Sequence, residues 1–244
     1  MRFLTLLLAL FAGPMGCGGL LLKGTTPFVV PKAPIFPEAV DAPGEKLGAA
    51  RVTHLDQLVG GPAATGQIGD FVLYNDLIRV VIDDLPRATG FARSGGNLVD
   101  ADRVPGGNDQ LAQLFTYLDH AFPRQLIYDR MYLTRSGADG TMAEIVVTGV
   151  DSRNPLLTGV TRYQIEPDQP YVRIVTRITN QGGEVVRDYE LGDSVQWGLT
   201  EPFVPGIDGA VAGKTTQSPW VAGVGSMVSY GLATSTSSLS GPHG

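Results

Sequence analysis

The 244-residue chain is 43% hydrophobic and 17% charged, enough apolar sequence for one substantial core and at most a small second one. Its formal net charge is −6, and no cluster of lysines and arginines stands out in the sequence, so we expect no nucleic acid partner. The 32 glycines and 17 prolines favour short strands joined by many turns over long helices. Cys17 is the sole cysteine, so no intramolecular disulfide can form.

The N-terminus has the pattern of an export leader. Met1-Arg2 gives a positive start, and Phe3–Ala12 is an apolar run too short to span a bilayer but typical of a secretory signal. Small residues follow as far as Cys17. We therefore predict a signal peptide over residues 1–16 and an exported protein.

The sequence around Cys17 resembles the bacterial lipoprotein signal, in which the cysteine becomes the lipidated N-terminus. Pro14 departs from that motif, which prefers leucine there, and Met15 is also unusual. The resemblance implies lipidation of Cys17, a membrane partner through the lipid anchor, and attachment to the bacterial cell envelope. Gly18 is not the aspartate associated with inner-membrane retention, which favours the outer membrane. The alternatives are simple secretion after an ordinary cut and a segment that is not a signal.

Residues 17–50 read as a tether that precedes a domain at 51–244. Five prolines make an extended, semi-rigid spacer, namely Pro27, Pro31, Pro34, Pro37 and Pro43. The alternative is a segment lying across the domain surface, because Phe28–Val30 and Ile35-Phe36 are apolar enough to pack.

A hairpin between Gly69 and Asp102 organises the domain. Phe71–Tyr74 and Leu77–Asp83 flank Asn75-Asp76, a two-residue connection whose members tolerate positive φ. Apolar residues alternate along the second arm, as expected for a half-buried strand.

The aspartate-rich segment 100–109 invites a calcium interpretation, because Asp100, Asp102 and Asp109 are hard oxygen ligands. Its spacing fails the EF-hand loop, since Pro105 stands where the glycine should be. We therefore expect no metal, and a loop that caps a following amphipathic helix over residues 108–121. Two signals indicate the helix. Asn108 or Asp109 can serve as its N-cap. Apolar residues then follow at helical spacing, namely Leu111, Leu114, Phe115 and Leu118.

Short strands follow this segment, bounded by turn residues. They are expected at Leu126–Thr134, Met142–Val150, Val160–Glu166, Tyr171–Asn180, Glu184–Leu191 and Ser226–Leu232. The fold class predicted is mainly β, an antiparallel β-sandwich with one helix. Such a sandwich usually needs more strands, so we expect the domain to be incomplete at its C-terminus and the chain to be the front part of a longer protein.

Three segments, FVLYNDLIRVVID, GGNLVDAD and YVRIVTRITNQG, resemble the supersandwich domains of galactose mutarotase type over about residues 66–200. They also resemble the N-terminal β domain of large exported bacterial proteins, sometimes found ahead of a metal-dependent PHP-type hydrolase domain. Mutarotases use a histidine acid and a glutamate base. No such pair is matched here, since His54, His120 and His243 are isolated and Glu201 lacks a partner histidine, so no catalytic residue is carried over.

Catalytic motifs are weak. The sequence has no His-x-His, HExxH, CxxC or P-loop pattern, and Ala92 stands where a G-x-S-x-G elbow around Ser94 needs glycine. Trp197 and Trp220 could stack on sugar rings, with core packing as the alternative. The candidate ligand-binding residues are Arg93, Asp109, Trp197, Glu201 and Trp220, with no metal and no cofactor.

Three functions follow as hypotheses. The leading one is a surface-tethered, non-catalytic domain that binds carbohydrate or another envelope component. The second is an accessory N-terminal domain of a larger exported metal-dependent hydrolase. The third is a sugar epimerase or lyase with a cleft where Glu201, Asp109 or Arg93 converge. We expect this chain alone not to be an enzyme.

Overall fold

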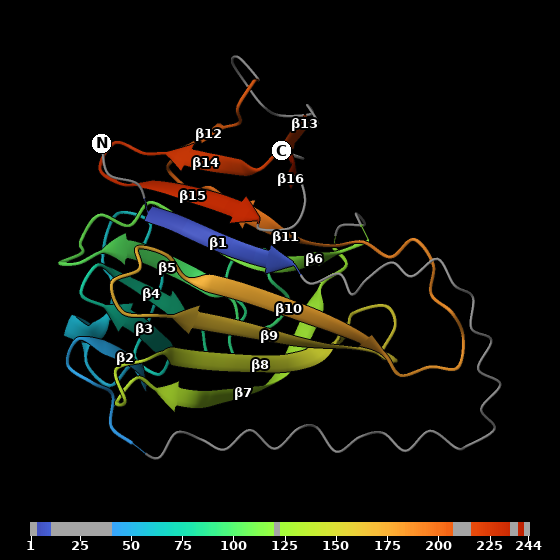
Figure 1. Ribbon diagram of the computed structural model, residues 1–244, viewed down its shortest axis with the longest axis horizontal. Helices are drawn as coiled ribbons and strands as arrows, with labels where there is room; N and C mark the ends of the chain where they lie inside the picture. Colours follow the sequence, from blue (N-terminus) through green and yellow to red (C-terminus); the bar gives the residue numbers. More distant parts are fainter. Residues whose placement is uncertain (1–3, 11–40, 120–122, 207–215, 235–238, 242–244) are drawn as a thin grey trace.

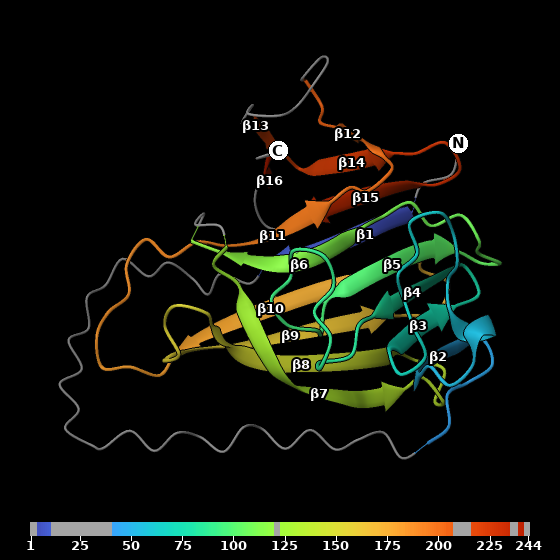
Figure 2. The same ribbon diagram turned by 180° about the vertical axis from the view of Figure 1, so that it is seen from behind.

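The structure, a computed structural model, describes residues 4–10, 41–119, 123–206, 216–234 and 239–241. Within them the chain is mainly β and builds antiparallel sheets, which confirms that part of the predicted fold class. Figure 1 shows the larger sheet in front, and Figure 2 shows the smaller one from behind.

The larger sheet contains eight strands within the described ranges. Their spatial order is β12 (Glu201–Phe203), β14 (Trp220–Val224), β15 (Ser229–Thr234), β1 (Leu4–Leu10), β10 (Arg173–Asn180), β9 (Leu157–Ile165), β8 (Ala143–Asp151) and β7 (Leu126–Ser136). The smaller sheet has six, in the order β11 (Leu191–Gln196), β6 (Gln113–Leu118), β5 (Leu98–Arg103), β4 (Ile78–Ile82), β3 (Phe71–Asn75) and β2 (Leu47–Arg51). A short pair, β13 (Thr216–Ser218) with β16 (Leu239–Gly241), and one 3-10 turn, η1 (Leu55–Gln57), complete the elements.

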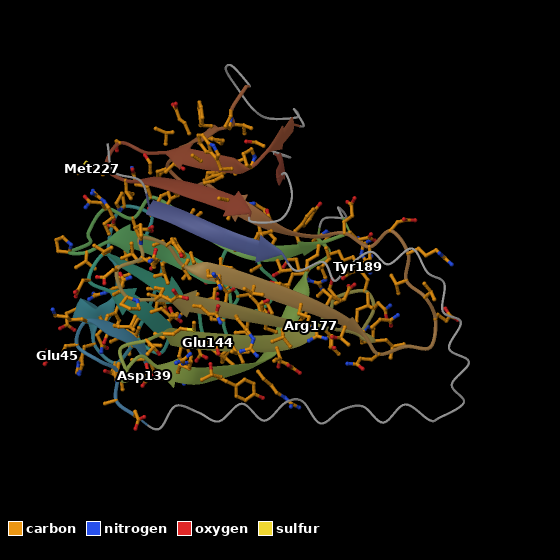
Figure 3. All side chains as sticks on the ribbon, in the orientation of Figure 1. Glu45, Asp139, Glu144, Arg177, Tyr189 and Met227 are labelled. Atoms are coloured by element: carbon orange, nitrogen blue, oxygen red, sulfur yellow. The ribbon has the colours of Figure 1, made fainter. Side chains whose placement is uncertain are left out.

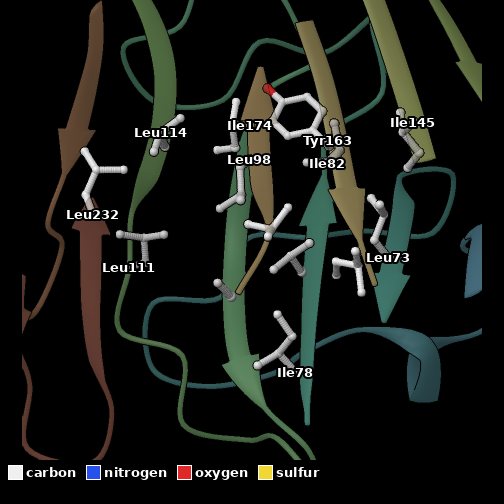
Figure 4. Packing of buried hydrophobic residues seen from close by; sticks show 14 of the residues in the cluster. Leu73, Ile78, Ile82, Leu98, Leu111, Leu114, Ile145, Tyr163, Ile174 and Leu232 are labelled. Atoms are coloured by element: carbon white, nitrogen blue, oxygen red, sulfur yellow. The ribbon is translucent and has the colours of Figure 1, made fainter. Parts of the chain in front are cut away.

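One hydrophobic core lies between the two sheets. Along β9 every second residue is buried, so its odd-numbered side chains face the smaller sheet and its even-numbered ones face outward. Buried side chains from both layers meet in Figure 4, including Leu73, Ile82 and Leu98 from the smaller sheet and Ile145, Tyr163 and Ile174 from the larger. Burial of this apolar surface is the main force that holds the two layers together.

The predicted hairpin is formed, but its turn works differently. Tyr74 pairs with Arg79, so the two-residue loop is Asp76-Leu77. Neither Asn75 nor Asp76 has positive φ, so that reason for the turn was wrong. Instead the Asn75 side-chain oxygen accepts hydrogen bonds from the N–H groups of Leu77 and Ile78, both at 2.9 Å.

The Asn75 amide also joins the two sheets. It donates to the carbonyl oxygens of Glu166 and Gln169, both at 2.8 Å, in the connection between β9 and β10. One buried side chain thus fixes both the hairpin turn and the position of the facing layer.

The predicted helix over residues 108–121 is wrong, because residues 113–118 form strand β6. This strand pairs along its whole length with β11, from Gln113 opposite Gln196 to Leu118 opposite Leu191. Both faces of β6 are largely buried, so its apolar residues do not alternate, and a short apolar run of this kind can mimic helical spacing. Residues 120 and 121 of the predicted helix lie outside the described residues.

Three other segments can be compared with the predictions. The segment Glu184–Leu191 is not a strand, since β11 begins only at Leu191. Strand β2 begins at Leu47, whereas the domain was predicted to begin at Arg51. The apolar segment Leu4–Leu10, predicted as the leader's hydrophobic run, is strand β1 and pairs in parallel with β10 and β15. No helix in the described ranges is long and apolar enough to cross a membrane.

Candidate functional site

Four of the five predicted ligand-binding residues gather at one end of the fold, around β12, β14 and β15. Trp197 lies on its inner side, partly buried and packed against the main core. Gly223 of β14 lies so close to the Trp197 ring that a Cβ atom at that position would collide with it. Trp197 is therefore a packing residue in this structure, the alternative left open by the sequence.

Asp109 is also on the inner side and is fully buried. Its Oδ1 accepts hydrogen bonds from the N–H groups of Ala101 (3.1 Å) and Leu111 (3.3 Å) and from the Tyr230 hydroxyl (2.9 Å). Its Oδ2 is buried without a hydrogen-bond partner. Burial raises the pKa of Asp109 to about 7. This side chain joins β15 to the segment after β5 and has no access to solvent.

Trp220 and Glu201 lie on the outer side of the same end. Trp220 is 40% exposed and stacks on Phe203, which is 44% exposed, with 5.6 Å between ring centroids and 26° between the ring planes. Phe203 pairs with Ala222 and Glu201 with Val224, so Glu201, Phe203 and Trp220 share one face of β12 and β14. We call Phe203 and Trp220 the aromatic platform.

The platform has the chemistry of a sugar-binding surface. Exposed aromatic faces stack on the apolar faces of sugar rings, and an exposed carboxylate such as that of Glu201 can accept hydrogen bonds from hydroxyl groups. Sequence analysis missed Phe203. The sequence feature that could have revealed it is its position two residues after Glu201, because this spacing puts both side chains on one face of a strand.

Arg93 lies elsewhere, exposed in the connection between β4 and β5, where its backbone N–H donates to Gln125 Oε1 at 3.0 Å. With Asp109 buried and Glu201 on the outer face, the three residues do not line a common cleft. The convergent cleft expected for a sugar epimerase or lyase is thus not formed by them.

The side chains of Asp100 and Asp102 in the aspartate-rich segment accept hydrogen bonds from backbone N–H groups. Asp100 accepts hydrogen bonds from the N–H groups of Thr65 and Gly66, both at 2.8 Å, and Asp102 accepts one from the N–H of Asn108 at 2.7 Å. These bonds hold loops against the outer face of the smaller sheet. Within the described part of the chain, no group of three or more histidine, cysteine or acidic side chains is placed to hold a metal ion.

Two further carboxyl groups are buried between or beside the strands. Burial raises the pKa of Asp83 to about 7, although its Oδ1 accepts a hydrogen bond from the Asn97 N–H at 2.8 Å. Burial likewise raises the pKa of Asp193 to about 7, and both of its side-chain oxygens are buried without a hydrogen-bond partner. Neither group reaches the aromatic platform through a hydrogen bond.

Comparison with family models, with curated proteins and with solved structures found no match to this chain.

Proposed function

We propose that this chain is a non-catalytic β domain that binds carbohydrate on the aromatic platform and is tethered to the bacterial cell surface through lipidated Cys17. The cut before Cys17 would remove the leader and, with it, strand β1. The observation that carries the proposal is the stacked, exposed pair of Phe203 and Trp220. Large aromatic side chains are usually buried, and two exposed ones in contact form a surface suited to a ligand with an apolar face. The supersandwich resemblance, with its sugar-binding members, agrees with this class of ligand.

The carboxylate of Glu201 would orient a sugar ring bound on the platform. It lies on the same face of β12 as Phe203, at the distance of two residues along the strand. A sugar ring stacked on the platform would place its equatorial hydroxyl groups toward this carboxylate. The platform would thus supply contact area, and Glu201 would select among ring orientations.

Binding of neutral oligosaccharides by the full chain tests the proposal. We expect cellohexaose or chitohexaose to bind in a calorimetric titration, and Trp220→Ala or Phe203→Ala to weaken binding about tenfold, since an aromatic contact contributes up to ~1.5 kcal/mol. Leu199→Ala is the matched control, because Leu199 is an exposed apolar residue that precedes β12 in the sequence and is not part of the platform.

Two results would overturn the proposal. One is a folded wild-type protein that binds none of a broad panel of neutral oligosaccharides. The other is release of new reducing ends from a bound glycan, which would replace a binding domain with an enzyme.

A further inference from the structure

A second surface, on the outward face of β7, β8, β9 and β10, collects arginines from distant parts of the sequence. Strand register brings them together: Arg173 lies opposite Gln164, Gln164 opposite Glu144, and Glu144 opposite Arg135. The same register places the remaining members on this face. The set consists of Arg130, Arg135, Arg162, Arg173 and Arg177, and we call it the arginine face. Figure 3 shows this side of the sheet, with Arg177 and Glu144 labelled.

Acidic partners account for only part of this charge. Arg162 forms an ion pair with Glu144 at 3.0 Å, and Arg135 forms one with Asp139 at 3.1 Å. Arg130, Arg173 and Arg177 are exposed and have no acidic partner among the described residues. Two other acidic side chains are close: Asp129 is exposed inside β7 next to Arg130, and Glu166 follows the end of β9. The face is therefore cationic on a chain whose net charge is −6.

Glu144 organises the centre of the face. Its Oε1 accepts from Thr134 at 2.6 Å as well as from Arg162, and its Oε2 accepts from Gln164 at 2.6 Å. The carboxylate is almost fully buried by these neighbours. This network fixes Arg162 in the middle of the face, whereas the three arginines without acidic partners surround it.

The spacing of those three suits a repeating anion. Arg173 and Arg177 are four residues apart on one strand, about 13 Å at ~3.3 Å per residue. Arg130 lies in the same row as Arg177, three strands away, about 14 Å at ~4.8 Å per strand. A single phosphate or carboxylate cannot touch all three guanidinium groups. Arg177 stands at the corner of this arrangement, so a linear polymer with regularly spaced carboxylates can reach two of the three, Arg173 with Arg177 along the strand or Arg130 with Arg177 across the strands. Guanidinium binds each carboxylate with two parallel hydrogen bonds.

The apolar side chains that the register places on this face, such as Val146, Val160 and Val175, are buried or half-buried, which argues against a lipid surface. The exposed large hydrophobic residues of the described chain lie on other loops and strands, and none belongs to the outward face of β7 to β10. Surfaces that bind membranes usually combine cationic side chains with apolar ones that enter the bilayer.

We propose that the arginine face binds a linear polysaccharide that carries carboxylate groups. This goes beyond the function proposed above, because it rests on charge at one edge of the larger sheet and not on the aromatic platform at the other. Both surfaces belong to one sheet, so a single chain presents one surface for sugar rings and another for acidic groups.

Polygalacturonate, with one carboxylate per sugar, is the probe for a direct test with the full chain. We expect wild type to bind it in 50 mM salt, and the double substitution Arg173→Gln with Arg177→Gln to weaken binding at least tenfold. Fully methyl-esterified polygalacturonate, which has the same backbone without the charge, should bind more weakly, and the double substitution should not change its affinity. Affinity should fall steeply with added salt, and less steeply for the double variant.

The control is Arg153→Gln with Arg187→Gln, which changes net charge equally at exposed positions off the face. It should remain within twofold of wild type. An equal loss in this control would overturn the proposal, as would failure of folded wild type to bind polygalacturonate, or preferred binding to phosphatidylglycerol vesicles. Trp220→Ala should leave polygalacturonate binding intact, so the two proposals fail separately.

Discussion

The aromatic platform and the arginine face stand at opposite edges of one sheet and differ in how they are built. The platform comes from two short paired strands, β12 and β14, and its two rings contact each other directly. The arginine face comes from four long strands, and its arginines are held apart by the register. Contact between apolar rings creates a surface for stacking, whereas separation of like charges creates a surface for a polymer. One backbone arrangement thus supports two binding chemistries.

The largest expected effect is a difference in the free energy of unfolding. Substituting an interior arginine should destabilise the domain far more than substituting one on the arginine face. Arg124 is only 12% exposed and donates to the buried Asp151 carboxylate at 2.6 and 2.9 Å. Arg124→Ala should cost about 3–5 kcal/mol, because it leaves a buried charge without its partner. Arg173→Gln should change stability by less than about 0.5 kcal/mol. Urea unfolding of both variants measures the difference, and similar losses would show that the arginine face is structural.

The next effect separates the two tryptophans. Trp197→Ala removes a ring packed against the core and should destabilise the domain by about 3 kcal/mol. Trp220→Ala removes a largely exposed ring and should cost about 1 kcal/mol or less, while weakening glycan binding. Unfolding curves and titrations on the same samples compare them. If both variants were equally destabilised, Trp220 would be a packing residue.

Two glycines test how rigidly each region is packed. A Cβ at Gly149 of β8 would meet backbone atoms of Ile127 and Tyr128, which cannot move without disturbing the strand pair. A Cβ at Gly223 would meet the side chains of Trp197 and Thr200, which can move further than paired backbone can. We expect Gly149→Ala to cost about 3 kcal/mol and Gly223→Ala about 1 kcal/mol. Thermal unfolding measures both, and the reverse order would contradict this view of the packing.

Stability should also depend on pH, through carboxyl groups that lie on neither surface. The pKa values of Asp83, Asp109 and Asp193 are raised to about 7 by burial, so the folded state binds protons that the unfolded state has already released above pH ~4. Stability is therefore greatest at the acidic end of this window. It falls as pH rises toward 7 and stays low above it. We expect a loss of at least ~1 kcal/mol between pH 5 and pH 8.

Single asparagine substitutions identify the groups responsible. Asp109→Asn keeps an oxygen for the N–H groups of Ala101 and Leu111 and removes the titration, so it should flatten the dependence. Asp139→Asn is the control: hydrogen bonds from Thr141 lower the pKa of exposed Asp139 to about 2, so it stays ionised throughout. Unfolding midpoints from pH 5 to 8 give the answer, and an unchanged slope in Asp109→Asn and Asp193→Asn would refute the assignment.

Sequence pattern alone predicted the mainly β class, the central hairpin and most strands from β7 to β10, because alternation along a half-buried strand is a local property. The strand Leu157–Ile165 buries every second residue and was found within a few residues. The same reasoning failed for β6, since a strand covered on both faces loses its alternation and its leucines then match helical spacing.

The two surfaces depended on information that no local pattern contains. From the sequence Trp197 and Trp220 are equivalent, yet Trp197, which follows β11, packs against the core, whereas Trp220 lies on the outward face of β14. The arginines at 130, 162, 173 and 177 look scattered along the chain until strand register aligns them. Composition and periodicity determined that this chain builds antiparallel sheets. Which side chains meet on a sheet was decided by pairing between strands distant in sequence, because burial and contact depend on what packs against each face.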